Sequence, residues 1–139
     1  MSTPSPDWSG LLPPSLVTIE NIADAAFADL PPAFRKLCEG LVIRVEDFPD
    51  DEILDEMDCE TEFDLLGLFR GAGQEQSGAT AESGQSPNMI WLYRRPILDY
   101  WAESDELLGA VITHVLVHEI GHHFGLSDED MDAIENRAA

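Results

Sequence analysis

The sequence predicts a single α+β domain, and three observations lead to that class. The chain has 139 residues, which is the length of one domain that can bury a core of its own. Apolar residues make up 44% of it, close to the average of soluble globular proteins. Segments whose apolar residues follow a helical period are interspersed with short apolar, β-branched runs, so both helices and a small sheet are expected.

Residues 1–15 are expected to form a flexible tail, because they carry four prolines together with serine and glycine. A single domain would then occupy residues 16–139. From Thr18, a plausible N-cap, apolar residues at helical spacing predict a first helix. The proline pair that begins at Pro31 stops this helix and can open a second one, which runs to Gly40.

The middle of the chain is predicted to supply the sheet. Residues 41–48 are β-branched and apolar and predict a strand, and residues 63–71 can form a second one. A short acidic helix or turn is expected between them, at 50–58. Residues 89–98 predict a third strand, and Pro96 indicates either an edge strand or the end of the strand.

Before and after this third strand, the sequence predicts a loop and a helical C-terminal part. Residues 71–88 are rich in glycine, serine and glutamine, which is typical of a flexible loop. A long helix with Ser104 as N-cap is expected over residues 105–124, and it is apolar nearly all round, as buried helices are. Gly125 is placed to end it, and Ser127 can cap a last helix.

The charge of the chain excludes some classes of partner. There are 28 acidic residues against 7 basic ones, giving a net charge of −21. Such a field repels phosphate backbones and anionic membrane surfaces, so neither nucleic acid nor a membrane is expected as a partner.

The N-terminus lacks a basic and apolar signal segment, and the two cysteines, Cys38 and Cys59, are interpreted as free thiols. A cytoplasmic location is therefore expected.

The four histidines all lie within one ten-residue stretch, and two of them belong to an H-E-x-x-H motif from His118 to His122. Residues four apart in a helix share a face, so the two imidazoles can bind one Zn²⁺ ion from the same side. Glu119 points about 100° away and can hold a water without being a ligand. The alternative is a pair of core histidines with satisfied hydrogen bonds.

A third ligand is predicted after the helix. Glycine readily adopts the left-handed conformation, so Gly125 can reverse the chain and let Asp128 return to the metal. Two imidazoles, one carboxylate and a water form an open, catalytic type of zinc site. An acidic residue in the first turn of a helix is also ordinary without a metal.

Three further residues are candidates for an outer partner of the metal site or for stabilising the transition state. His114 lies one helical turn before His118, and His123 follows a predicted ligand but is turned away from it. Tyr93 is a candidate only because it precedes the helix in the sequence. For His114, a core or surface role is at least as plausible.

The stretch HEIGHHFGLSDEDM resembles the zincin-like metallopeptidases, in particular a small bacterial family of minimal zincins with the pattern H-E-x-x-H-x-x-G-x-x-D. The resemblance extends over residues 16–139. It implies a minimal zincin-like fold, a small mixed sheet of about three to four strands packed on helices that include a buried active-site helix. It also implies a hydrolase of peptide or protein substrates, with His118, His122 and Asp128 as zinc ligands and Glu119 as general base.

Two departures from the larger zincins stand out. The third ligand is an aspartate where metzincins use histidine, and only eleven residues follow it, so Met131 is expected to be core in the final helix. Two other interpretations stay open. One is a non-catalytic, metal-stabilised binding module that docks a basic partner on the acidic stretch 46–64, which holds eleven acids and no base. The other is a mononuclear iron site, although such sites usually have a different spacing on a β-barrel.

Overall fold

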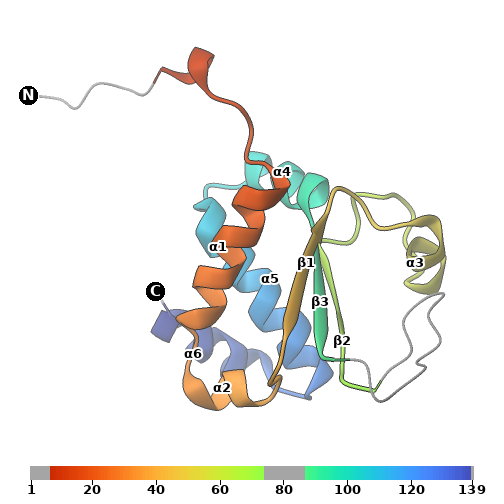
Figure 1. The fold of residues 1–139 in the computed structure, drawn as a ribbon, viewed down its shortest axis with the longest axis vertical. Helices are drawn as coiled ribbons and strands as arrows, with labels where there is room; N and C mark the ends of the chain where they lie inside the picture. The colour runs from red at the N-terminus through yellow and green to blue at the C-terminus, as the bar shows by residue number, and fades with distance from the viewer. Residues whose placement is uncertain (1–6, 74–86, 139) are drawn as a thin grey trace, which may run out of the picture.

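The computed structural model describes residues 7–73 and 87–138 of the chain and is shown in Figure 1. The helices are η1 (Trp8–Gly10), α1 (Leu16–Ala28), α2 (Pro32–Lys36), α3 (Asp51–Glu56), α4 (Arg94–Glu103), α5 (Leu108–His123) and α6 (Asp128–Ala138). The strands are β1 (Val42–Glu46), β2 (Gly67–Arg70) and β3 (Met89–Tyr93). No described helix is long and apolar enough to cross a membrane.

The three strands form one mixed sheet in the order β1-β3-β2. β3 is central, parallel to β1 and antiparallel to β2, so that Met89 lies opposite both Val42 and Arg70. Helices α1 and α5 cover one face of the sheet, and α3 packs on the other (Figure 1). The predicted α+β class, with a small mixed sheet on helices, is thereby confirmed.

The main core lies between this sheet and the pair α1 and α5. It takes Ile90 and Leu92 from the central strand and most of the apolar side chains of α5, several of which are fully inaccessible to solvent. Met131 of α6 is also fully buried and packs against Gly121, as expected of a core residue in the final helix. α5 is thus the buried helix that the sequence predicts, and its position is fixed by packing on three sides.

The predicted strand over residues 89–98 forms in its first half only. Of the two possibilities that Pro96 left open, the nearby end of the strand is confirmed and the edge position is wrong. The strand ends at Tyr93, and it is the central strand, with a partner on each side. Pro96 belongs to the first turn of α4, where its missing N–H costs no hydrogen bond because the first N–H groups of a helix have no partner within it. Among the strands in residues 7–73 and 87–138, β1 and β2 form the edges of the sheet.

Two predicted N-caps are also wrong. Ser104 closes α4, where its hydroxyl donates to the Trp101 carbonyl at 3.1 Å, and α5 begins four residues later at Leu108. At the start of α1 the cap is Ser15, whose hydroxyl accepts the Thr18 N–H at 3.1 Å. In each case a serine or threonine lies within one turn of a helix end, and the sequence alone does not show which end it caps.

The turn between α5 and α6 forms as predicted. Gly125 has a φ of 75°, and the N–H groups of Gly125 and Leu126 donate to the carbonyls of His122 and Gly121, at 3.2 and 2.9 Å. This is the Schellman pattern that ends helices at a left-handed residue. The Ser127 hydroxyl then accepts the Asp130 N–H at 3.1 Å and caps α6. The chain therefore reverses sharply directly after the H-E-x-x-H motif.

Replacing Gly125 with alanine is expected to lower the free energy of unfolding by about 1 kcal/mol, because the left-handed conformation is unfavourable for a residue with a Cβ. Urea denaturation measures the change. Gly109→Ala is the matched control, since Gly109 lies inside α5 with no atom within 4 Å of an added Cβ. The control is expected to be neutral or stabilising. Equal losses in both variants would contradict the assigned role of Gly125.

Parts of the predicted tail and loop lie outside the described residues, namely residues 1–6 and 74–86. Their predicted flexibility stays a prediction. The two ends of the 71–88 loop are held together by Asn88, which is 8% exposed. Its side chain accepts the Ala72 N–H at 2.6 Å and donates to the Glu39 carbonyl at 3.1 Å. The loop therefore starts and returns at one fixed point beside β2 and β3.

Candidate metal centre

The second half of α5 lies directly against the edge strand β2. Gly67 makes this close approach possible, because a Cβ at this position would lie 2.7 Å from Cγ1 of Val115 and 3.5 Å from Cγ of Glu119. Val115 and Glu119 are one turn apart and so share the face of α5 that is turned to β2. The glutamate of the H-E-x-x-H motif is thereby placed between the helix and the edge strand.

Replacing Gly67 with alanine is expected to cost about 1–3 kcal/mol of stability, the usual range for overpacking. The added methyl would meet the Val115 side chain and also the Trp91 carbonyl oxygen at 3.1 Å, which belongs to the neighbouring strand. Chemical denaturation of Gly67→Ala and of Gly67→Ala/Val115→Ala measures the effect. If the double variant recovers no stability relative to the sum of its single changes, the two residues do not meet as described.

Glu119 is half-buried between α5 and β2. Burial raises the pKa of its carboxyl, because the charged form loses solvation, and the nearby His122 opposes that shift. The carboxylate is therefore close to the second histidine of the motif and removed in part from water. A group in this setting can accept a proton more readily than a fully solvated carboxylate.

His118 and His122 lie one turn apart on α5, as predicted. Their ring centroids are 5.6 Å apart and the ring planes are nearly perpendicular, at 87°. His122 is exposed, whereas the side chain of His118 is 20% exposed and is turned towards α6. Asp128 is the exposed first residue of α6, immediately after the Gly125 turn.

The ligand atoms that the structure brings together include only one of the three predicted ligands. Across residues 7–73 and 87–138, the metal-binding side chains whose ligand atoms all lie within 4.8 Å of one another are His114, His118 and Glu135. The ligand atoms of His122 and Asp128 are not part of this group. Their role as ligands, with His118, stays a prediction.

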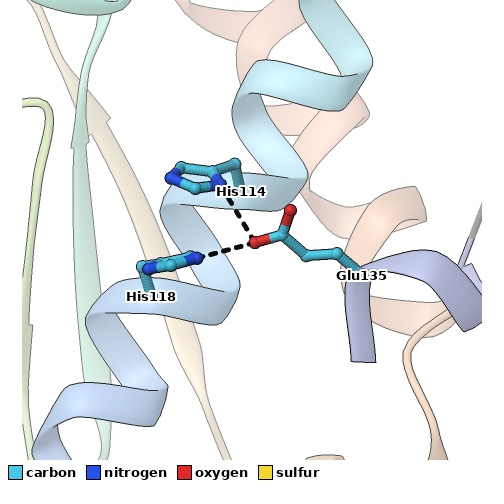
Figure 2. A group of neighbouring side chains, drawn as sticks. All are labelled: His114, His118 and Glu135. Carbon is cyan, nitrogen blue, oxygen red and sulfur yellow. Dashed lines mark ion pairs between the residues drawn. The ribbon is translucent and has the colours of Figure 1, made fainter. Parts of the chain in front are cut away.

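Figure 2 shows this cluster at the contact between α5 and α6. The imidazoles of His114 and His118 are stacked with centroids 3.8 Å apart, and both face Glu135 from α6. Oε1 of Glu135 lies 3.0 Å from Nδ1 of His114 and 2.9 Å from Nε2 of His118. The sequence reasoning missed Glu135, although it follows the buried Met131 by one turn and therefore lies on the side of α6 that faces α5.

Two other candidates lie away from this cluster. Tyr93 is 2% exposed and belongs to the small core with Ile53 and Leu68, on the α3 side of the sheet. Burial raises the pKa of its hydroxyl. His123 packs against Phe69, with ring centroids 4.8 Å apart, and against Gly71 at the end of β2. The structure thus places Tyr93 on the opposite face of the sheet from α5, and His123 at the β2 side of that helix.

The residues present fit a zinc ion. Nε2 of His118 is buried and, within the described part of the chain, has no hydrogen-bond partner, although Glu135 is close. Imidazole nitrogen and carboxylate oxygen are both ordinary zinc ligands. The buried Nε2 of His118 makes no hydrogen bond among the described residues, and the exposed imidazole of His122 lies one turn away. This arrangement is suited to bind a metal.

The comparison with known families agrees with the fold and the motif. A family model described as zincin-like metallopeptidase matches residues 38–138, which include the whole sheet, α5 and α6. The chain belongs to this family, and membership implies zinc binding and the general class of metallopeptidases. The resemblance seen in the sequence is thereby confirmed over residues 38–138. No curated protein matches the chain significantly.

Proposed function

We propose that this chain is a peptidase in which His118, His122 and Asp128 hold one Zn²⁺ ion and Glu119 is the general base. The family supports the metal and the class of reaction. The two histidines lie one turn apart, and the Gly125 turn starts α6 with Asp128 only six residues after His122. Two imidazoles and one carboxylate leave a fourth position open, as catalytic zinc sites require.

Glu119 handles the proton in this proposal. When bound, zinc lowers the pKa of a coordinated water towards about 7 and polarises a carbonyl oxygen. The Glu119 carboxylate, half-buried beside His122, accepts the proton of the attacking water and passes it to the leaving amine. Its Cγ lies 3.5 Å from the position that a Cβ of Gly67 would take, so the edge strand restricts the space open to this side chain before the reaction.

We place the substrate along β2. Within the described residues, this strand has a sheet partner on one side only, β3, so its other edge can take an extended peptide. β2 runs beside the face of α5 that carries Glu119, which brings a paired peptide close to the base. β3 is central in the sheet and has no free edge for a peptide, since β1 and β2 pair with its two sides. The net charge of −21 disfavours nucleic acid and anionic membranes as partners.

The acidic stretch 46–64, the alternative docking surface, lies largely on the α3 side of the sheet, away from α5 (Figure 1). Some of its acids already have partners within the chain. Glu56 pairs with Arg70, Asp47 pairs with Arg94 at 3.0 Å, and Asp64 accepts two backbone N–H groups of its own loop. We therefore favour the peptidase, which the family and the motif both support.

The observation that carries the proposal is the arrangement on the last two turns of α5, with Glu119 between two histidines and facing the edge strand. The test is digestion of a peptide mixture derived from a proteome, with new termini identified by mass spectrometry. The zinc-loaded chain is expected to produce termini that disappear after chelation and return when zinc is restored. If zinc binds stoichiometrically and no termini depend on it, the chain is not a peptidase.

A further inference from the structure

The cluster of His114, His118 and Glu135 contains the ligand types of a metal site, but only His118 is among the predicted peptidase ligands. All three side chains point into one space at the contact of α5 and α6 (Figure 2). His114 is 51% exposed, so this space is open to solvent from one side. His118 and Glu135 are 20% and 24% exposed and form its inner wall.

The spacing of the ligand atoms suits a tetrahedral ion. Two ligands that bind zinc at 2.0–2.1 Å in a tetrahedral arrangement lie about 3.3 Å apart. Oε1 of Glu135 lies 3.0 Å from Nδ1 of His114 and 2.9 Å from Nε2 of His118. One ligand atom from each of the three residues lies within 4.8 Å of those of the other two. Lengthening the two contacts to Glu135 by a few tenths of an ångström would therefore bring those pairs of atoms to the spacing of tetrahedral zinc ligands.

A second and independent observation concerns hydrogen bonding. Nε2 of His118 and Oε1 of Glu135 are both buried, and neither has a hydrogen-bond partner among the described residues. They lie 2.9 Å apart, at ion-pair distance, so what is missing is the geometry of a hydrogen bond and not a neighbour. Buried polar atoms without well-formed hydrogen bonds are unfavourable, and a cation bound by both atoms would satisfy them at once.

We propose that His114, His118 and Glu135 form a second binding site for a divalent transition metal such as Zn²⁺. The donor set of two imidazoles and one carboxylate matches that ion, and the net charge of −21 favours the approach of cations. Because His118 is common to both ligand sets, an ion held here withdraws His118 from His122 and Asp128. This consequence rests on the proposed peptidase function. A chain with its ion bound at the second site would hold zinc but would not cleave peptides.

Calorimetric titration with Zn²⁺ of full-length variants tests the proposal. The His122→Ala/Asp128→Ala chain lacks two of the predicted peptidase ligands and is expected still to bind one ion. Adding Glu135→Gln in that background is expected to weaken binding by more than about 100-fold, beyond the 10–100-fold typical of losing an outer partner of a ligand. The wild-type chain is expected to bind one ion, because the two sites share His118.

Three results would overturn the second site: no zinc bound by the His122→Ala/Asp128→Ala chain, unchanged affinity after Glu135→Gln, or two ions in the wild type. A nuclear magnetic resonance measurement that needs no substitution in the cluster itself keeps the test valid if the Glu135→Gln chain does not fold. In the His122→Ala/Asp128→Ala chain, the imidazole nitrogen resonances of His114 and His118 should shift on addition of Zn²⁺, while those of His123 should not. The matched chain His114→Ala/Glu135→Gln keeps the predicted peptidase ligands, so its zinc binding and cleavage report on the proposed function separately.

Discussion

The Glu119→Gln chain is expected to cleave peptides about 10²–10⁴-fold more slowly than the wild type, the range in which a positioned general base contributes. Glutamine has nearly the same shape and cannot take a proton from water. It fits the same space beside Gly67 and Val115, so the fold and the zinc content should not change. The measurement is kcat/KM on a peptide cleaved by the wild type, with zinc determined in the same samples.

Two outcomes separate the base from other roles. Unchanged cleavage by a Glu119→Gln chain with full zinc would contradict the assigned mechanism. Loss of zinc together with cleavage would instead make Glu119 a ligand, which is at odds with its position between α5 and β2. Glu129→Gln, an exposed change on the neighbouring helix α6, is the matched control and should leave both quantities unaltered.

The His118→Ala chain is expected to lose zinc binding, with an affinity more than about 100-fold weaker, because His118 is the residue that both ligand sets contain. Cleavage should be lost with it. Calorimetry with Zn²⁺ measures the affinity, and circular dichroism establishes that α5 still forms. No other substitution among the four histidines is expected to have so large an effect on the metal.

His123→Ala is the matched control for this prediction. His123 is on the same helix but packs against Phe69 and the end of β2, so its removal should leave zinc affinity within a few-fold of wild type. Equal zinc affinity in the His118→Ala and wild-type chains would contradict both proposed metal sites, because each of them includes His118. Equal losses in the His118→Ala and His123→Ala chains would point to a general disturbance of the helix.

The features that follow from the sequence are those specified by neighbouring residues. The α5–α6 corner is an example, since Gly125 and Ser127 act through hydrogen bonds to residues three to five positions away. The pairing of His118 with His122 on one face follows in the same way from helical geometry. Both could therefore be predicted without knowledge of the tertiary structure.

The order of the strands could not be predicted in this way. β3 is central because β1, about 45 residues earlier, and β2, about 20 residues earlier, both pair with it, and no local pattern records these partners. Pro96 left two possibilities open for the same reason, and only the end of the strand is correct. A proline excludes the interior of a strand, but it does not show whether the chain leaves the sheet as an edge strand or as a helix.

Glu135 was missed because the contact between α5 and α6 is tertiary. Its place on the Met131 side of α6 is visible in the sequence, yet the sequence does not show that this side meets His114 and His118 rather than solvent. Tyr93 shows the opposite error. Nearness in sequence to α5 suggested a role at the site, but alternation along β3 turns its side chain to the α3 face.

The most direct test of the peptidase account is the position of zinc in crystals of the zinc-loaded wild-type chain, located by anomalous diffraction. The account predicts an ion at about 2.0–2.2 Å from one nitrogen each of His118 and His122 and from an Asp128 oxygen, with Glu119 near but not bonded. An ion bonded to Glu119, or no ion joining His118 to His122, would contradict it. An ion found only among His114, His118 and Glu135 would do so as well, while establishing the second site.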